Sequence, residues 1–236
     1  MPEPDTPRSQ TRASLADRVH DRLKTEIFDF RLMPGDRLSE NEIAARVDAS
    51  RTPVREALFR LQREGYVEML SKGGWQVRPF DFDTFEQLYD VRVVLENAAV
   101  RRICEMDSEP APLTELQKVW LVPEAERLTD NRRVWHLDEQ FHATLVAAAG
   151  NREMARIHQD VTERIRIIRR LDFTKPSRVA ATYDEHGEIL RTLACKRIDQ
   201  TQRFLKSHIE TSRNEVRKIT LHMLYAARAE LASGHG

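Results

Sequence analysis

Residues 38–77 read LSENEIAARVDASRTPVREALFRLQREGYVEMLSKGGWQV. Their apolar residues follow helical spacing in two short blocks, and Asp48 and Ala49 form a tight turn between the blocks. The apolar face of the first block consists of Leu38, Ile43, Ala44 and Val47. Ser39 is placed to cap this helix, with Glu42 as its capping-box partner. The pattern predicts a helix-turn-helix, which makes double-stranded DNA the first partner to consider.

The second helix of this pair carries the residues that we expect to contact DNA. Its apolar face consists of Val54, Ala57, Leu58 and Leu61. Arg51 and Arg55, four residues apart, share the opposite face with Thr52. Guanidinium groups there can bind guanine edges or phosphates. Ser50 or Thr52 can cap the helix, and a hydroxyl at this end can bind the DNA backbone.

A hairpin is expected after the second helix, which should end at Gly65. Two β-rich runs, residues 66–70 and 75–78, flank a turn with Lys72 and Gly73 at its tip. Arginines four residues apart usually mark only a solvated face. The succession of a short helix, a tight turn, a second helix that begins with arginine and a hairpin is more specific. It predicts a winged helix-turn-helix.

The motif SRTPVREAL at residues 50–58, followed by RLQREGYV at residues 60–67 and the hairpin, resembles the DNA-binding domain of GntR-type bacterial transcription regulators. We place this domain at residues 11–79. The resemblance implies DNA contacts by Arg51, Thr52 and Arg55 and, at a wing tip in the minor groove, by Lys72 and Gly73. The fatty-acid-responsive member has a DNA-contacting arginine on the first of the two helices where this chain has Asn41, so its operator details are not carried over.

The charges of the chain balance, with 38 Lys and Arg against 38 Asp and Glu over 236 residues. This balance excludes a globally basic nucleic-acid coat. Residues 44–80 nevertheless carry seven Lys or Arg against four acids, which is a local positive patch. Such a modest patch indicates that one protomer would hold DNA weakly. We therefore expect a homodimer that binds two operator half-sites.

Cysteine use and hydropathy indicate the compartment of the protein. Cys104 and Cys195 lie far apart without a CxxC motif, which fits reduced cytosolic thiols. No targeting segment is visible, and the longest apolar stretch, residues 145–149, is far shorter than the roughly twenty residues that span a bilayer. We expect a cytoplasmic protein with no membrane partner, and disorder in a tail at residues 1–10 and at residues 233–236.

Residues 83–232 are expected to form an all-helical domain. Glycine and proline become rarer there, and helical periodicity replaces β-branched runs. The predicted helices span residues 84–104, 113–130, 132–149, 152–171, 179–194 and 196–231. Pro123 should kink or end the second of them. Because short loops join the helices, the fold class is mainly α, a winged helix-turn-helix followed by an all-α antiparallel bundle.

Four side chains of this half could bind one divalent cation. Asp138 and His142, four residues apart, share a helical face, and His186 and His208 lie on later helices. By itself this pattern is weak evidence for a metal site. The chain has eight histidines, and a single helix histidine is more often a surface or core residue than a ligand.

The same pattern resembles a known effector-binding domain. Its parts are Asp138, Phe141-His142, Gly150-Asn151, Glu185-His186 and His208. Together they are similar to the FCD domain of the FadR subfamily of GntR regulators, over essentially all of residues 83–232. The resemblance implies an effector-binding and dimerisation domain in which Asp138, His142, His186 and His208 bind a divalent metal, commonly zinc, nickel or manganese. The number of predicted helices favours the shorter, VanR-like six-helix variety.

A small organic acid is the effector that such a metal could bind. Four protein ligands leave one or two positions on a metal that accepts five or six, and the cation offsets the desolvation of an incoming carboxylate. Arg92 matches an arginine in the first FCD helix of related regulators and is the best second anchor. Arg164 and Arg169 are weaker candidates, for which ion pairs are the better explanation. Trp135 and Phe141 flank the predicted site at the spacing of core residues.

These features predict a metabolite-responsive DNA-binding regulator. The acid would stabilise one arrangement of the bundle and thereby change operator affinity; repression relieved by the effector is the commoner habit of the family. One alternative is a DNA-binding protein with a purely structural metal and no effector. The other is a metal-dependent hydrolase or lyase. Glu139 and Glu185 adjoin metal ligands but point elsewhere around their helices, so neither is a convincing general base, and we expect no enzyme.

Overall fold

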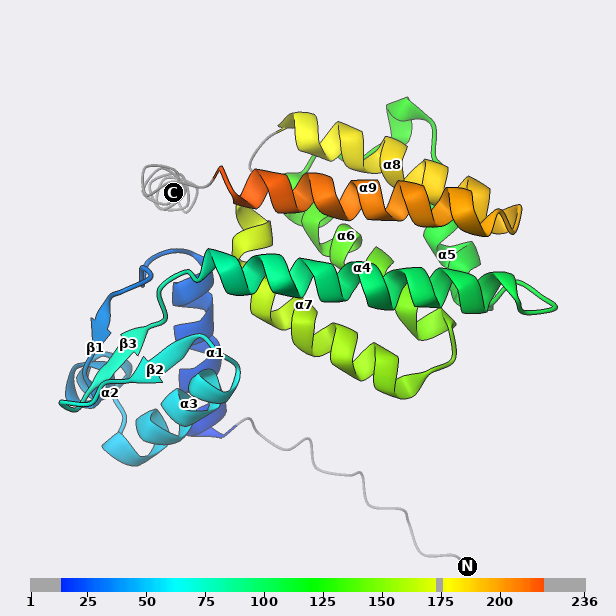
Figure 1. Cartoon of the computed structure of the whole chain (residues 1–236). Coiled ribbons are helices and arrows are strands. Elements are labelled where there is room, and N and C mark those ends of the chain that lie inside the picture. Colours follow the sequence, from blue (N-terminus) through cyan, green and yellow to red (C-terminus); the bar gives the residue numbers. More distant parts are fainter. Residues whose placement is uncertain (1–13, 173–175, 219–236) are drawn as a thin grey trace, which may run out of the picture. The chain divides into compact units, whose positions relative to one another are not determined.

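The computed structural model describes residues 14–172 and 176–218. Contacts between Cα atoms divide the chain into two units, Met1–Pro79 and Phe80–Gly236. The first unit combines short helices with a small sheet, and the second is built from longer helices (Figure 1). The predicted fold class is thereby confirmed. The proposed disordered segments, residues 1–10 and 233–236, lie outside the described residues.

The first unit is a winged helix-turn-helix. Its described elements are α1 (Leu15–Phe28), β1 (Arg37–Leu38), α2 (Glu40–Val47), α3 (Arg51–Arg63), β2 (Val67–Met69) and β3 (Trp75–Val77). The strands form an antiparallel sheet in the order β1-β3-β2. The β2-β3 hairpin is the wing, and its turn requires glycine because Gly73 and Gly74 both have a φ of 86°.

α1 was not among the predicted elements. Ser14 and Asp17 form a capping box at its start, in which each side chain accepts a hydrogen bond from the other residue's backbone N–H. Val19, Leu23 and Ile27 then recur at four-residue spacing and are buried, and the helix packs against α3. A serine three residues before an acid, followed by this spacing, is the signal that would have identified the helix.

The start of α2 differs from the prediction. Ser39 and Ser50 stand at the N-cap positions of α2 and α3, but neither side chain makes a capping hydrogen bond, so the proposed capping box with Glu42 is wrong. Leu38 belongs to β1, not to the helix. The chain stays extended through Ser39, and Leu38 pairs with Trp75 across the sheet. The tight turn after α2 places Asp48 in the left-handed region, with a φ of 50°.

The second unit is a helical domain. Its described elements are α4 (Phe82–Cys104), α5 (Ala111–Trp120), the 3₁₀ turn η1 (Glu124–Glu126), α6 (Asn131–Ala148), α7 (Arg152–Asp172), α8 (Pro176–Ala194) and α9 (Ile198–Val216). The helix predicted at residues 113–130 is too long, because α5 ends before Pro123 and η1 follows it. The part of the last predicted helix beyond residue 218 lies outside the described residues.

The helices of this unit enclose a shared interior. α9 lies along α4 and also packs against α8, while α6 contacts both α4 and α7 (Figure 1). α6 and α8 contact each other as well, so α4, α6, α8 and α9 all border the same space. No helix in the described part of the chain combines the length and the apolar character needed to cross a membrane.

Candidate DNA-binding surface and candidate metal centre

The proposed DNA contacts lie on the exposed face of α3 and at the wing. The side chains of Arg51 and Arg55 are 60% and 53% exposed, and Thr52 beside them is exposed as well. Ser50, at the N-cap of α3, is also exposed. Both arginines line one concave surface together with residues of α2 and of the hairpin, including Gly73 but not Lys72. The fold therefore brings the two arginines and part of the wing to one side of the domain.

Glu40, in the first turn of α2, is a residue that the sequence patterns did not single out. Its carboxylate accepts hydrogen bonds from Arg51 and Arg55 and from the indole Nε1 of Trp75. The hydrogen bond from Arg55 is the main reason why the pKa of Glu40 falls to about 2. Glu40 is therefore ionised at neutral pH. No local sequence signal links it to partners that lie far along the chain.

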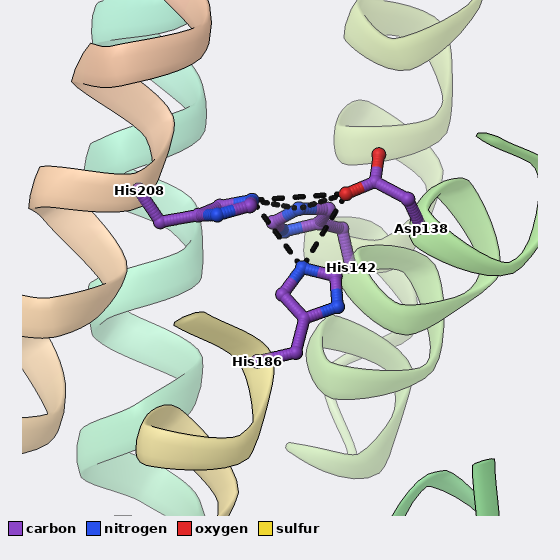
Figure 2. A group of neighbouring side chains, drawn as sticks. All are labelled: Asp138, His142, His186 and His208. Carbon is purple, nitrogen blue, oxygen red and sulfur yellow. Dashed lines mark hydrogen bonds and ion pairs between the residues drawn. The ribbon is translucent and has the colours of Figure 1, made fainter. Parts of the chain in front are cut away.

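The proposed metal ligands converge in the interior of the helical unit. Asp138 and His142 come from α6, His186 from α8 and His208 from α9, and all four side chains are buried. One ligand atom from each lies within 4.8 Å of the others. Figure 2 shows the three imidazoles and the carboxylate pointing toward a common centre. The i, i+4 pair on α6 and the two distant histidines thus meet as the sequence predicts.

Five of the six separations between these atoms are those of one coordination sphere. The Nε2 atoms of His142 and His186 lie 3.1 and 3.3 Å from Nε2 of His208. Oδ1 of Asp138 lies 3.4 Å from Nε2 of His186 and 3.7 Å from Nε2 of both His142 and His208. Ligand atoms at about 2.1 Å from a metal are about 3.0 Å apart at right angles and about 3.4 Å apart at the tetrahedral angle. The four residues therefore fit a divalent cation.

Neighbouring carboxylates fix the orientation of two of the imidazoles. Nδ1 of His142 lies 2.6 Å from Glu96, and Nδ1 of His208 lies 2.5 Å from Glu185. Burial disfavours ionisation of Glu185, but its hydrogen bonds with His208 and Arg178 outweigh burial and hold its pKa at about 2. Burial likewise opposes ionisation of Glu96, and its basic neighbours hold the pKa well below the usual value. An ionised carboxylate can only accept, so each Nδ1 donates, and Nε2 is the ring atom that would bind a metal.

His186, His208 and Asp138 are in the protonation state that a metal requires. Burial lowers the pKa of His186 well below its usual value and lowers that of His208 to about 4. Burial opposes ionisation of Asp138, but Arg169 outweighs it and keeps the pKa well below the usual range. The ring of His186 stacks on Phe141 at 3.7 Å between centroids. These groups can bind a cation without first losing protons at neutral pH.

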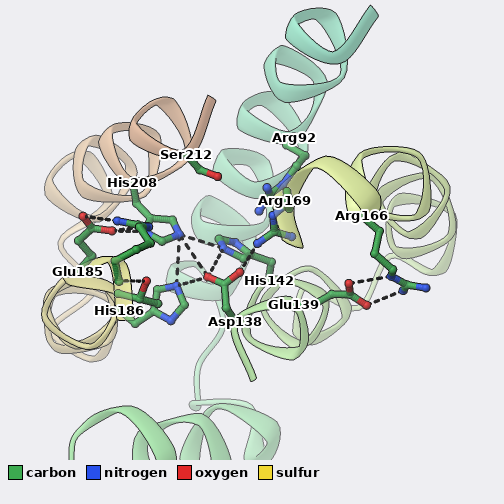
Figure 3. Close-up of polar contacts among 12 residues, drawn as sticks. Arg92, Asp138, Glu139, His142, Arg166, Arg169, Glu185, His186, His208 and Ser212 are labelled. Carbon is green, nitrogen blue, oxygen red and sulfur yellow. Dashed lines mark hydrogen bonds and ion pairs between the residues drawn. The ribbon is translucent and has the colours of Figure 1, made fainter. Parts of the chain in front are cut away.

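Buried arginines adjoin this centre (Figure 3). Arg169 pairs with Oδ2 of Asp138, which is the ion pair expected for it. Arg92 is 1% exposed and donates from Nε to Glu96 at 2.9 Å. Within the described part of the chain, Nη2 of Arg92 and both Nε and Nη1 of Arg169 are buried without a hydrogen-bond partner. Arg164 is exposed, so the structure does not bring it to this interior.

Glu139 does not serve as a base beside the centre. Both of its carboxylate oxygens accept hydrogen bonds from Arg166, at 2.5 and 2.8 Å. Figure 3 shows this pair pointing away from the four ligands. Trp135 is buried, as expected of a core residue.

Comparison with known proteins agrees with this two-part architecture. The model of the bacterial regulatory protein family gntR matches residues 15–77, and the model of the FCD domain matches residues 87–211. The chain belongs to the GntR family. In this GntR-family protein the matched segments correspond to the winged helix-turn-helix and to the helical domain. The resemblance inferred from the SRTPVREAL motif and the Asp/His pattern is thereby confirmed.

Relatives of this GntR-family protein are named as regulators. The Nta operon transcriptional regulator of Aminobacter aminovorans is 30% identical over 190 residues, which cover 80% of this chain and 89% of the relative. The transcriptional repressor RspR of Escherichia coli is 25% identical over 200 residues, which cover 84% of this chain and 86% of RspR. A putative GntR regulator from Rhodococcus shares the fold, with a TM-score of 0.67, 24% identity and coverage of 87% and 98%. The protein is a DNA-binding transcriptional regulator and not an enzyme.

Proposed function

We propose that this regulator binds a divalent metal and, at that metal, a small organic acid that changes its affinity for operator DNA. The observation that carries the proposal is the convergence of Asp138, His142, His186 and His208 in the interior of the FCD domain. Zinc, nickel and manganese all accept imidazole and carboxylate ligands. When bound, the metal would supply a positive charge with open coordination positions for the carboxylate of the acid.

Arg92 and Arg169 are the residues that would bind the rest of the effector. Their guanidinium groups are buried beside Asp138 and Glu96 and retain N–H donors that no described residue engages. A buried donor without an acceptor is unfavourable, so an incoming carboxylate would relieve that cost. Arg92 remains the principal anchor, as the family resemblance implies. Arg169 is added because the structure places it against Asp138.

The N-terminal domain would bind the operator with the exposed end of α3 and with the wing. The proposed contacts are Ser50, Arg51, Thr52, Arg55, Lys72 and Gly73. A homodimer would place two such domains on two half-sites, with residues 11–79 as the DNA-binding domain and residues 83–232 as the effector and dimerisation domain. The relative RspR is named a repressor, which supports repression as the output. A regulator of the chromosome would act in the cytoplasm.

A metal-dependent ligand screen tests the proposal. Thermal unfolding of the full chain is followed with a panel of small organic acids, with chelator and with added zinc, nickel or manganese, because specific binding raises apparent stability. We expect one class of acid to stabilise the protein only when metal is present. The His186→Ala variant should lose both metal and this response.

A histidine outside the proposed site provides the control for His186→Ala. His136, six residues before His142, is exposed, so His136→Ala should keep metal content and the acid response. Full metal content in His186→Ala would show that the metal lies elsewhere. If chelator lowers the unfolding temperature while no acid acts, the metal is structural and the effector is excluded.

A further inference from the structure

One acid, Glu40, holds both of the arginines that we propose as DNA contacts. Arg55 donates to its two carboxylate oxygens, from Nε at 3.0 Å and from Nη2 at 2.9 Å. Arg51 donates from Nη2 at 3.0 Å. The indole Nε1 of Trp75 donates to the same carboxylate at 3.3 Å. One side chain thus joins α2, α3 and the wing strand β3.

Burial places this carboxylate behind the arginines. The side chain of Glu40 is 13% exposed, whereas those of Arg51 and Arg55 are 60% and 53% exposed. All three line the concave surface between α2, α3 and the hairpin. An isolated surface ion pair restrains its partners little. A mostly buried acceptor that two guanidinium groups share, one of them in two-point geometry, restrains both side chains more strongly.

The hydrogen bonds to Glu40 leave three of the five N–H donors of Arg55 available. A guanidinium group has five N–H donors, and Arg55 uses one on Nε and one on Nη2 for the carboxylate. Both hydrogens of Nη1 and the second hydrogen of Nη2 remain. The Nη1–Nη2 edge can bind O6 and N7 of guanine together. Arg55 can therefore bind a base edge while it stays attached to Glu40.

We propose that Glu40 is a positioning residue that raises affinity for the correct sequence and lowers non-specific affinity for DNA. Holding Arg51 and Arg55 in place reduces the side-chain freedom that is lost when they meet the correct bases. The negative charge of Glu40 opposes phosphate on any sequence. The two effects have opposite signs, which a merely structural role would not produce. The inference rests on the proposed DNA contacts of these arginines.

The variant Glu40→Gln in the full chain tests this role. Glutamine has nearly the same shape, but it offers one acceptor oxygen and places an NH₂ donor against guanidinium donors. The probes are the duplex that the wild-type protein selects from a random-sequence library and a scrambled duplex of equal length. We expect affinity for the scrambled duplex to rise and affinity for the selected duplex to fall. Their ratio should decrease about tenfold, as expected for a weakened two-point base contact.

Two further variants separate charge from geometry. Glu42 is an exposed acid of α2 for which the described structure has no hydrogen bond to either arginine. Glu42→Gln should therefore raise both affinities and keep their ratio. Glu40→Asp keeps the charge but shortens the side chain, so it should lower the ratio without raising affinity for the scrambled duplex. The indole resonance of Trp75, one of three tryptophans, should shift in Glu40→Gln and not in Glu42→Gln.

The outcomes that overturn the inference are distinct from failure of the proposed DNA contacts. An unchanged ratio in folded Glu40→Gln and Glu40→Asp would exclude a positioning role. Tighter binding of the selected duplex by Glu40→Gln would show that the acid competes with DNA, which also contradicts the proposal. The Arg55→Ala variant checks the premise. If Arg55→Ala retains full affinity for the selected duplex, both the proposed DNA contact of Arg55 and the role of Glu40 are wrong. If Arg55→Ala loses affinity while the ratio of selected to scrambled affinity is unchanged in Glu40→Gln, only the role of Glu40 is wrong.

Discussion

Glu96 connects the proposed metal ligands with the proposed effector anchor. This fully buried carboxylate accepts hydrogen bonds from His142 at 2.6 Å, from His158 at 3.0 Å and from Arg92 at 2.9 Å. Glu96→Gln would replace an ionised acceptor by an amide with one acceptor oxygen, so three donors would compete for that oxygen and His142 would be oriented less firmly. We expect metal affinity to fall about 10- to 100-fold, measured by competition with a chelating dye.

The control for this variant is Glu139→Gln. Glu139 adjoins Asp138 in sequence, but its carboxylate is bound to Arg166 and not to a metal ligand. Metal affinity should be unchanged in this control. Equal affinity in Glu96→Gln and the wild-type protein would remove Glu96 from the support of the site.

Glu40 also predicts a pH dependence of stability. Its pKa is about 2 in the folded protein against an ordinary value of 4.5, chiefly because Arg55 donates to the charged form. A lowered folded pKa contributes stability that is fully present above about pH 4.5 and is lost as pH falls toward 2. The destabilisation caused by Glu40→Gln should therefore shrink as pH falls from about 4.5 toward 2. Urea unfolding followed by the Trp75 indole resonance measures it, and a difference that stays constant with pH would contradict the ion pair.

The residues that sequence alone could assign are those with a local pattern or a family motif. Asp138 and His142 are four apart on one helix, and the FCD resemblance added His186 and His208. Glu96 has one local partner, Arg92, four residues earlier, but that pair gives no signal of the site. The partners that define the roles of Glu96 and Glu40 lie farther along the chain: His142 is 46 positions from Glu96, and Arg55 is 15 positions from Glu40. Only the tertiary structure brings these groups together.

At the scale of elements, the wing is the part whose DNA contact is easiest to isolate. Lys72 lies in the β2-β3 turn beside Gly73 and is exposed, so it can approach phosphates without supporting the core. Lys72→Ala should weaken binding to selected and scrambled duplexes alike. The slope of log K against log salt should decrease in magnitude by about 0.9, the value for one phosphate contact. Titrations at several salt concentrations measure this slope.

Lys118→Ala is the control for Lys72→Ala, because it removes the same charge from the other unit. Lys118 is 65% exposed on α5, so its removal alters net charge equally without touching the wing. The salt slope should remain that of the wild-type protein. A slope that is also unchanged in Lys72→Ala would place the wing tip away from the DNA backbone.

Elements with strong periodicity were predictable, and those defined by long-range pairing were not. α4, α6, α7 and α8 lie within a few residues of their predicted bounds because their apolar positions recur over many turns. β1 has only two residues, and its strand character comes from pairing with β3. α5 ends at Trp120, ahead of Pro123, which was predicted to kink or end this helix, although the predicted range continued to residue 130. Local sequence patterns were therefore enough to predict most of the bundle, whereas β1 could be recognised only from its pairing in the tertiary structure.

At the scale of the whole molecule, metal, effector and DNA should be linked through one free-energy coupling. The DNA contacts belong to the unit Met1–Pro79, and the proposed ligands of metal and acid belong to the unit Phe80–Gly236. Any effect of the acid on operator affinity must therefore pass between two folding units. If the protein is a repressor that the effector relieves, we expect the acid to weaken operator binding. A typical coupling would weaken it by about 5- to 150-fold.

Thermodynamic reciprocity requires the acid and the DNA to change each other's affinity by the same factor. If metal-loaded protein binds the selected duplex more weakly with acid by some factor, the same protein on DNA must bind the acid more weakly by that factor. Calorimetric titration of acid into free and DNA-bound protein, and of duplex into free and acid-bound protein, measures both sides. His186→Ala should show no coupling, because the acid would lose its metal. Acid binding that is tight but identical in free and DNA-bound protein would mean that the acid does not regulate, since a ligand with equal affinity for two states shifts neither.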